Sequence, residues 1–418
     1  MQSLDLEFTE EQREIINLSR ELAQKKIKPV RMKHDEDESF PWEVVEQLRQ
    51  ADLMGVYLPE EYGGMGGANT ELCLVVEELS KACAGVALCV AANGLCAIPI
   101  LIFGNEEQKK KWLPDIASGK RLGAFAITEP EAGSDATAQK TTAKLDGDHY
   151  TLNGTKTFIS NGEVAELYIV FANANPKKGA RGITAFVVEK GTPGFTMGKK
   201  ETKMGIRASP TYELIFDNCK VPAANRLWSE GRGLFVAQTT FDFSRIGVGA
   251  QAIGLAHGAM EETMEYAKMR RQFGQPIISF QAIQHMLADC AAQIEAGRTL
   301  MYAVNKMMDK LLKESIAKSR TSGKLVYEEL RALNPGRLTK YSAMVKLFCA
   351  DVAMKVTTDC VQICGGIGYM RDFPVEKYMR DAKITQIYEG TSQMQRNEIA
   401  MMLIKETASK DAKVPVGV

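Results

Sequence analysis

The chain has 418 residues, of which 45% are hydrophobic and 25% are charged, as is typical of soluble globular proteins. Its 52 basic and 52 acidic residues balance, so the overall charge favours neither nucleic acid nor an anionic membrane surface as a partner. A chain of this length is expected to form about two or three domains. We expect no apolar run of the roughly 20 residues that a bilayer requires, and no membrane span.

Cysteine and histidine usage argues against a metal or disulfide protein. The nine cysteines are scattered through apolar contexts, and the four histidines show no metal-ligand spacing. No CxxC pair occurs, and an odd number of cysteines does not fit a disulfide framework. The N-terminal stretch MQSLDLEFTEEQREI is acidic and polar, unlike a signal or transit segment. We therefore expect a bacterial cytoplasmic protein without a metal.

The first part of the chain has a helical hydrophobic period, from residue 9 to about 120. Thr9 and Gln12 have capping-box spacing, and residues 41–53, 70–83 and 105–119 repeat apolar side chains near period 3.6. Four of the five residues from Gly63 to Gly67 are glycines. They fit a tight turn between helices better than a phosphate-binding loop, because no strand precedes them.

From about residue 123 to 225 the period shortens to that of strands. Asn153-Gly154 stands in a hairpin position, and residues 166–174, 182–190 and 212–222 are rich in β-branched and aromatic side chains. A helical period returns at about 232, in long segments of the kind that bundle. We predict an α+β chain with an N-terminal α-helical domain over 1–122, a middle antiparallel β-domain over 123–231 and a C-terminal four-helix bundle over 232–418.

Three short stretches could carry chemistry. In FAITEPEAGSDA, residues 125–136, the residues alone fit either a strand-to-loop corner or a loop that faces a ligand. GGIGYM, residues 365–370, has spaced glycines but no preceding strand, so it is a weak dinucleotide signal. In QIYEGTSQMQR, Gly390 permits a tight turn after Glu389, and Thr391-Ser392 can cap a following helix. A glutamate before a helix is more often a solvated acid than a catalytic one.

Taken together with two further stretches, ITEPEAGSDA resembles a known family. CGGIGYMRDFPVEKYMRDAKITQIYEGTSQMQR (364–396) and MRRQFGQPIISFQAIQ (269–284) are similar to the other signatures of acyl-CoA dehydrogenases, closest to the short-chain, butyryl-type members. The resemblance runs in order from EFTEEQ to NEIA, over nearly the whole chain. It implies the family fold, FAD as cofactor, an electron-transfer flavoprotein as electron acceptor, and a homo-oligomer, usually a tetramer.

The resemblance also implies a reaction: dehydrogenation of an acyl-CoA to the trans-2-enoyl-CoA, in which a base takes the α-proton and flavin N5 takes the β-hydride. Glu389 matches that base, and Ser244 stands where some members carry theirs. An α-proton of a thioester is too weakly acidic for a carboxylate in water. Donors to the thioester carbonyl and a base whose pKa is raised by burial would close the gap.

The remaining family positions are carried over residue by residue. Phe158 and Ser160 replace the tryptophan and threonine that are common in the family. Arg270 and its neighbours resemble residues that reach the FAD of a neighbouring subunit, which makes a dimer the minimum unit. The substrate-binding positions correspond to Ser134, Asp242, Ser244, Arg245, Tyr388 and Glu389. The cofactor-binding positions correspond to Phe125, Ile127, Thr128, Gly133, Ser134, Phe158, Ser160, Arg270, Gln272, Phe273, Gln281, Gln362, Gly366, Thr391 and Gln393.

The sequence leaves two questions open, the role of one long segment and the identity of the acyl group. The segment between Arg298 and Lys346 is longer than in typical members, and its part at about 307–337 reads as a surface helical hairpin of unassigned role. Residues 89–100 are expected to line the acyl end, where Ala91, Ala92, Gly94 and the mildly polar Asn93 leave width and supply no charge. A short straight acyl group is the default, and a branched or alicyclic one stays open.

Other functions also fit the same residues. An enoyl-CoA reductase would run the reaction in reverse, and a flavin-binding scaffold without turnover would use the fold alone. An acyl-CoA oxidase is expected to have a longer chain. The intact Glu389 and flavin motifs favour the dehydrogenase.

Overall fold

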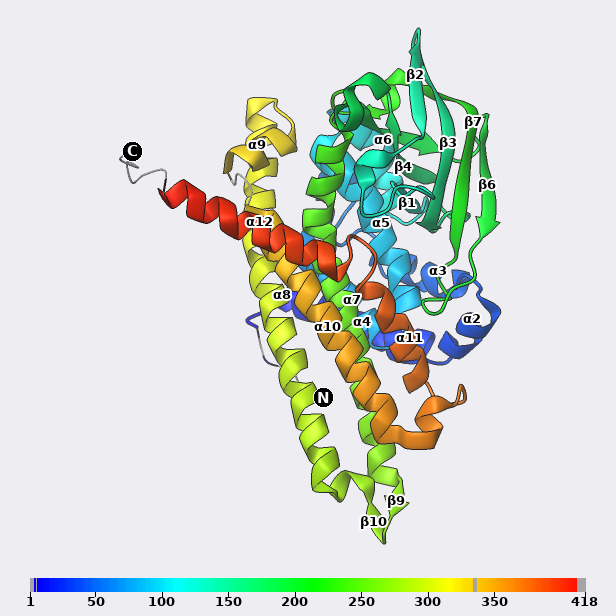
Figure 1. Cartoon of the computed structure of the whole chain (residues 1–418), viewed down its shortest axis with the longest axis vertical. Helices are drawn as coiled ribbons and strands as arrows, with labels where there is room; N and C mark the ends of the chain where they lie inside the picture. The colour runs from blue at the N-terminus through cyan, green and yellow to red at the C-terminus, as the bar shows by residue number, and fades with distance from the viewer. Residues whose placement is uncertain (1–3, 5, 334–336, 412–418) are drawn as a thin grey trace.

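A computed structural model describes residues 4, 6–333 and 337–411 (Figure 1). The N-terminal part is helical, and the predicted capping box begins it: Gln12 N donates to Thr9 Oγ1 at 3.2 Å, and Thr9 N donates to Gln12 Oε1 at 3.1 Å. Gly63 and Gly66 have φ angles of 80° and 76°, so the glycine-rich stretch is a turn between helices, as predicted. The helices are α1 (Glu10–Leu22), extended by a π-helical turn (Ala23–Ile27), then α2 (Arg31–Asp37), α3 (Trp42–Gln50), α4 (Asn69–Ser80), α5 (Ala84–Phe103) and α6 (Glu106–Ala117).

Helix α5 corrects one expectation. Its 20 residues are apolar enough, by length and composition, to cross a bilayer, so the expectation that no apolar run reaches that length was wrong. In the structure 89% of its apolar window is buried inside the fold. Burial on all sides explains why the helix is apolar all round. Within the described residues, α5 is a core helix packed against α4, α6, two helices of the C-terminal part and the sheet.

The middle part is an eight-stranded sheet in the order β6-β7-β3-β2-β4-β5-β8, with β1 beside β4. Most pairs are antiparallel, as predicted, while β1 and β2 each pair with β4 in parallel. The strands are β1 (Gly123–Ala126), β2 (Thr142–Asp146), β3 (His149–Ser160), β4 (Leu167–Asn173), β5 (Ile183–Glu189), β6 (Phe195–Lys200), β7 (Thr211–Pro222) and β8 (Arg226–Leu227).

Strand β4 shows how the sheet joins the helices. All seven of its residues are buried, and successive side chains point to opposite faces. Leu167, Ile169 and Phe171 belong to the core shared with the helices, whereas Tyr168 and Val170 belong to a second core on the other face of the sheet. One face of the sheet therefore packs against the helices, and its other face covers a second core that is formed largely by the sheet's own strands.

The predicted hairpin at Asn153-Gly154 is wrong. Both residues lie inside β3, which runs unbroken for 12 residues and shifts register against β7 between Leu152 and Gly154. Gly154 has φ of 147°, and a Cβ there would stand 2.5 Å from Thr141 Oγ1. The glycine thus serves a bulge where neighbouring backbones approach closely, which is the other common use of glycine in a strand.

The C-terminal part is a bundle of long helices (Figure 1). Gly323 ends α8 with φ of 70°, and α9 then packs back onto α8 and α5, so a helical hairpin occupies most of the segment predicted at 307–337. Figure 1 shows α12 leaving the body towards the C-terminus. The elements are α7 (Gly233–Met269), β9 (Arg271–Gln272), β10 (Gln275–Pro276), α8 (Gln281–Ser322), α9 (Val326–Leu333), α10 (Arg337–Cys364), a 3₁₀ turn (Gly365–Tyr369), α11 (Val375–Thr385) and α12 (Ser392–Asp411).

A buried carboxylate ties α4 to α8. Glu77 is 1% exposed and accepts hydrogen bonds from Arg298 Nε at 2.8 Å and from Tyr302 Oη at 2.6 Å. Burial alone would raise the pKa of Glu77, but Arg298, Lys81 and Tyr302 outweigh it and hold that pKa below its ordinary value. Glu77 is therefore ionised in the folded protein, and its partners hold the helical core in register.

Replacing Glu77 by glutamine is expected to destabilise the fold by about 3–5 kcal/mol, because Arg298 is left buried without its counter-charge. The folded pKa of Glu77 is depressed, so the stability that it supplies is present above its unfolded pKa of about 4.3 and is lost as pH falls through the folded value. Denaturant unfolding at pH 7 and at acid pH measures both effects.

Glu46→Gln is the matched control, since Glu46 pairs with Arg49 at 3.1 Å on the surface, where such pairs contribute less than about 1 kcal/mol. Equal unfolding free energies for the two variants would contradict the role given to Glu77.

Candidate active site

Glu389 lies at a tight corner between α11 and α12. Its φ is 53° and that of Gly390 is 91°, so two successive residues adopt left-handed backbone, which is strained for the glutamate and easy for the glycine. Thr391 Oγ1 accepts from Met394 N at 3.2 Å and caps α12, as predicted. Ser392 does not share this role, because its hydroxyl is buried without a partner in the described residues.

Three side chains hold the two carbonyls of this corner. Arg245 Nε donates to the Glu389 carbonyl at 3.1 Å, and Gln395 Nε2 donates to the carbonyls of Glu389 and Gly390 at 3.1 and 2.8 Å. Lys346 Nζ donates to the Gly390 carbonyl at 2.8 Å. Glu398 fixes Arg245 in turn, at 2.7 and 3.2 Å. We call Arg245, Lys346 and Gln395 the carbonyl clamp.

The Glu389 carboxylate is subject to opposing influences. Burial raises its pKa, while a hydrogen bond from Ser244 and the charges of Arg245 and Lys346 act to lower it, and burial prevails. Ser244 Oγ donates to Glu389 Oε2 at 2.5 Å. Burial also lowers the pKa of Lys346 to about 8. The site thus combines a carboxylate whose pKa lies above its ordinary value with two cations that keep it ionisable.

An apolar pocket opens beside this carboxylate. Helices α4, α5 and α7 form its walls, and Glu389 is the one charged residue among its described lining residues. Asn93 was expected to line this space, but its amide instead accepts from Gly123 N at 2.6 Å and donates to the Ile116 carbonyl, on the other side of α5. The lining residues are Leu72, Val76, Leu88, Ala91, Gly94, Leu95, Ile98, Ser244, Gly247, Val248, Gln251, Tyr388 and Glu389.

A polar pair lies at the last lining position of α7. The Tyr388 hydroxyl donates to Gln251 Oε1, and Gln251 Nε2 donates to the Ala84 carbonyl at 3.1 Å. Gln251 stands seven residues beyond Ser244, which corresponds to about 10 Å along a helix. Sequence reasoning missed Gln251, although its spacing from Ser244 and Val248 puts all three on one face of α7.

The loop after β1 is organised by a buried ion pair. Lys156 Nζ, on β3, donates to Glu129 Oε1 at 2.7 Å and to the Ile127 carbonyl at 3.0 Å. Thr157 N donates to the Thr128 carbonyl at 2.9 Å. Phe158, next on the strand, is held at φ of 60° and is 64% exposed. An exposed aromatic ring beside a loop of hydroxyls and glycine fits the face of a planar cofactor such as a flavin.

Aromatic contacts connect this loop to the clamp. The ring centroid of Phe125, on β1, lies 5.5 Å from that of Phe241 on α7, and the Arg245 guanidinium lies 5.7 Å from the Phe241 ring. The structure therefore brings Phe125, at the start of the 125–134 stretch, to the same side of α7 as the Arg245 that binds the Glu389 carbonyl. Gly133 and Ser134 are exposed on that loop, and Gln393 is exposed on the first turn of α12.

Asp242 lies one turn from Arg245, on the same helix. Its carboxylate accepts from Thr339 Oγ1 at 2.9 Å, while Oδ1 has no partner in the described residues. Burial raises the pKa of Asp242 to about 7, against the opposing charge of Arg245. Asp242 is thus a buried acid at the junction of α7 and α10, next to the expected acyl-CoA channel.

A second set of predicted residues lies elsewhere. Arg270, Gln272, Phe273 and Gln281 surround the β9–β10 hairpin and are exposed, Phe273 to 94%. Gln362 and Gly366 are exposed where α10 passes into its 3₁₀ turn, near the same end of the bundle (Figure 1). Met269, at the end of α7, stands 25 residues after Ser244, or roughly 37 Å along the helix. Within one chain these residues do not meet Glu389.

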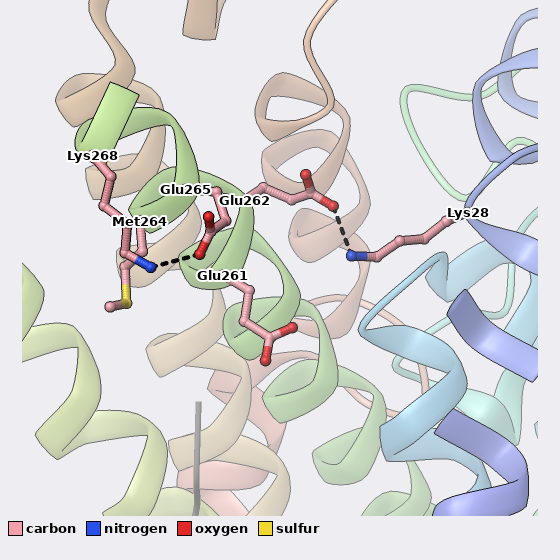
Figure 2. Close-up of a pocket in the computed structure, with 6 residues that line it drawn as sticks. All are labelled: Lys28, Glu261, Glu262, Met264, Glu265 and Lys268. Atoms are coloured by element: carbon pink, nitrogen blue, oxygen red, sulfur yellow. Dashed lines mark hydrogen bonds and ion pairs between the residues drawn. The ribbon is translucent and has the colours of Figure 1, made fainter. Parts of the chain in front are cut away.

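A second hollow has a different character (Figure 2). Lys28 pairs with Glu262 at 3.1 Å, and Lys268 pairs with Glu265 at 2.7 Å within α7, so two of the three carboxylates that line it pair with lysines that also line it. Its lining comprises Lys28, Glu261, Glu262, Met264, Glu265 and Lys268. It lacks the apolar walls of the cavity at Glu389 and is not a candidate for an acyl group.

Comparison with known proteins decides the family. Models of the acyl-CoA dehydrogenase N-terminal, middle and C-terminal domains match residues 9–120, 124–219 and 231–404. A short-chain specific acyl-CoA dehydrogenase of Megasphaera elsdenii is 45% identical over 397 residues, which cover 94% of this chain and 97% of that protein. The chain belongs to the acyl-CoA dehydrogenase family. It is therefore an FAD-dependent oxidoreductase that acts on acyl-CoA thioesters.

Other similar proteins span the same length. Acryloyl-CoA reductase (NADH) of Anaerotignum propionicum is 43% identical, covering 97% of each chain. The structure of butyryl-CoA dehydrogenase from Megasphaera elsdenii matches with a TM-score of 0.86 and 44% identity, over 96% of this chain and 100% of that one. A chain from a study of the electron transferring flavoprotein of Acidaminococcus fermentans matches with a TM-score of 0.87 and 46% identity, over 96% and 99%.

Two glycines of α7 allow a test of how the cavity is built. A Cβ at Gly247 would meet no atom within 4 Å, whereas one at Gly249 would stand 2.7 Å from Val345 Cγ1. Gly247→Ala is expected to stabilise the protein by up to about 1 kcal/mol, because alanine favours a helix. Gly249→Ala is expected to destabilise it, because overpacking costs about 1–3 kcal/mol. Denaturant unfolding of the two variants measures the difference, and changes of the same sign would contradict this geometry.

Proposed function

We propose that the protein converts a short-chain, branched or alicyclic acyl-CoA to its trans-2-enoyl-CoA, with Glu389 as the base that removes the α-proton. The observation that carries the proposal is the position of Glu389, held at a strained corner as the one charged residue among the described residues that line an apolar cavity. A carboxylate in such a place has a raised pKa, which suits proton abstraction from carbon.

The carbonyl clamp supports this role because it orients the base without neutralising it. Arg245 and Lys346 bind backbone carbonyls, so the Glu389 carboxylate is held by a hydrogen bond from Ser244 and not by either cation. Within the described residues, no hydrogen bond uses the backbone N–H of Glu389. That N–H is available to bind the thioester carbonyl, where it would stabilise the negative charge that develops as the α-proton leaves.

The cofactor is assigned to the loop after β1. Ile127, Thr128, Gly133 and Ser134, with Phe158 and Ser160 from β3, would hold the flavin ring, and Phe125 would support the loop. The flavin supplies the acceptor for the hydride that leaves the β-carbon. The ion pair of Lys156 and Glu129 keeps the loop in place, since Glu129 also accepts from the backbone N–H groups of Lys140 and Thr141.

The residues at the β9–β10 hairpin fit a second subunit. Arg270, Gln272, Phe273 and Gln281 with Gln362 and Gly366 are proposed to bind the pyrophosphate and adenosine side of an FAD whose ring lies in a neighbouring copy. An exposed Phe273 and the distance from Glu389 both favour such sharing. A homo-oligomer, with a tetramer as the expected form, is therefore part of the proposal, and a cytoplasmic location remains a prediction.

The cavity favours a small uncharged acyl group. Its described lining residues include no cation that would bind a second carboxylate, and the Tyr388–Gln251 pair lies about two turns beyond Ser244. Butyryl-CoA and short-chain names among the relatives agree with this length. Ala91, Gly94 and Gly247 leave width for a branched or alicyclic group. The channel for the CoA moiety is assigned to Ser134, Asp242 and Arg245.

The proposal also covers the direction of the reaction and the electron acceptor. An electron-transfer flavoprotein is the proposed acceptor, supported by the match to a chain from the Acidaminococcus study. The similarity to an acryloyl-CoA reductase favours a second candidate, an enoyl-CoA reductase that runs the reaction in reverse. A flavin-binding scaffold is disfavoured by the intact Glu389 site.

Glu389→Gln is expected to abolish bleaching of the flavin by saturated acyl-CoA thioesters without oxygen, because an amide cannot accept the α-proton. In the wild type, the bleaching rate should fall as pH drops through the Glu389 pKa, which burial raises above its ordinary value near about 4.3. Stopped-flow absorbance with butyryl-, isobutyryl-, cyclohexanecarbonyl- and glutaryl-CoA measures both.

Three results separate the candidates. Bleaching by one acyl class, lost in Glu389→Gln but with the flavin still bound, supports the dehydrogenase. Reoxidation of the reduced protein by an enoyl-CoA, with no bleaching by any saturated thioester, supports the reductase. If the wild type shows neither reaction, both the dehydrogenase and the reductase are ruled out.

Lys346→Met is expected to move the acid limb of the bleaching rate to higher pH by about 1 unit or more, because loss of a nearby cation raises the pKa of Glu389. Arg245 on α7 and Ser244 remain beside the carboxylate, Glu398 on α12 stays paired with Arg245, and Asp351 acts on Lys346 from α10. Lys346→Arg keeps the charge and serves as the control. An unchanged pH profile in Lys346→Met would show that Lys346 supports the turn only structurally.

A further inference from the structure

The end of α8 and the short helix α9 form a hairpin (Figure 1). The hairpin contacts α4 and α5, the two helices from the N-terminal part of the chain that form walls of the acyl cavity. Its outward side chains are mostly charged and exposed, while Val326, Tyr327 and Leu330 are buried on its inner face. The hairpin belongs to the segment for which the family resemblance implies no role. Its contacts fall on one end each of α4 and α5.

Residues of α8 provide the N-terminal cap of α4. Ala68, the residue before α4, provides no side-chain hydrogen bond to the first turn. Asp309 on α8 accepts from Asn69 N at 2.9 Å and from Thr70 N at 3.2 Å. Asn305, one turn earlier, accepts from Asn69 Nδ2 at 2.7 Å. A carboxylate at a helix N-terminus binds free N–H groups and opposes the helix dipole, so α8 fixes where α4 begins.

At α5, the hairpin packs on the last residue. The Tyr327 ring lies 4.6 Å from the Phe103 ring and 4.8 Å from the Trp228 ring, measured between centroids. Phe103 ends α5, and Trp228 lies in the loop after β8 with φ of 57°. Since aromatic packing of this kind leaves little free volume, Tyr327 limits how far the end of α5 can move.

Both contacts lie close to the cavity wall. Leu72 and Val76, on α4, line the cavity within two turns of the Asp309 cap. Leu95 and Ile98 line it from the last two turns of α5, before Phe103. A shift of either helix end would be transmitted along the helix, because a packed helix moves as a rigid element. The hairpin therefore contacts one end of each of two helices that form walls of the acyl cavity.

We propose that Asp309 and Tyr327 are positioning residues that set the width of the acyl cavity and so select the shape of the acyl group. The inference rests on the proposed function, since the cavity must bind an acyl chain. It assigns to the α8–α9 hairpin a part in specificity, while proton removal stays with Glu389. Neither residue lines the cavity, so both act through α4 and α5.

The test compares substrate preference in Tyr327→Leu and Asp309→Ala with that of the wild type, using the FAD-loaded full chain. The measured quantity is the ratio of kcat/KM for cyclohexanecarbonyl-CoA and for isobutyryl-CoA to that for butyryl-CoA, with one artificial electron acceptor throughout. We expect at least a threefold change of these ratios in both variants, carried mainly by KM. Tyr327→Phe keeps the aromatic ring and should give the same ratios as the wild type.

Exposed positions on the same two helices provide the controls. Lys313→Ala on α8 and Arg331→Ala on α9 change surface side chains and should leave the ratios unchanged. If Asp309→Ala does not fold, Tyr327→Leu carries the test by itself, because it leaves the cap of α4 in place. Ratios equal to those of the wild type, in folded variants that still turn over butyryl-CoA, would overturn the inference. A wild type that bleaches with no saturated thioester would instead overturn the proposed function, and this inference with it.

Discussion

The conformation of the Glu389–Gly390 corner is the constraint on which the site depends. A non-glycine residue with positive φ costs of order 1 kcal/mol or more, and the surrounding structure must repay it. Arg245, Gln395 and Lys346 do so from α7, α12 and α10 by binding the two carbonyls that the turn exposes. Because these donors come from three helices, the bundle must be assembled before the carboxylate is aimed into the cavity.

The same residues balance the electrostatics of the Glu389 carboxyl. Burial would hold the carboxyl neutral, and a neutral carboxyl cannot take a proton. The cations of Arg245 and Lys346 oppose burial from the backbone side of the turn, so they ease ionisation of the carboxyl without forming an ion pair that would block it. Burial also lowers the pKa of Lys346, to about 8, which shows that the two charges are held in one poorly solvated region.

The sequence predicted the α, β, α order because period 3.6 and period 2 are local properties of the chain. It also predicted the corner at Glu389, because Gly390 and Thr391 lie next to it. It failed at Asn153-Gly154, where glycine serves a bulge within β3, a choice that depends on Thr141 across the sheet. Lys346 and Asp309 had no local signal, because their partners lie 44 and 240 residues away.

The division of labour between helices bears on how the reaction direction arises. In the role proposed for it, Glu389 would remove an α-proton as a carboxylate and return one as a carboxyl, so the same base would serve dehydrogenation and reduction. The cavity formed by α4, α5 and α7 would hold the acyl chain in either case, since saturated and unsaturated chains of equal length have nearly equal shape. Under this proposal the direction follows from the potential of the electron-carrying partner, whereas the residues of this chain select the acyl group.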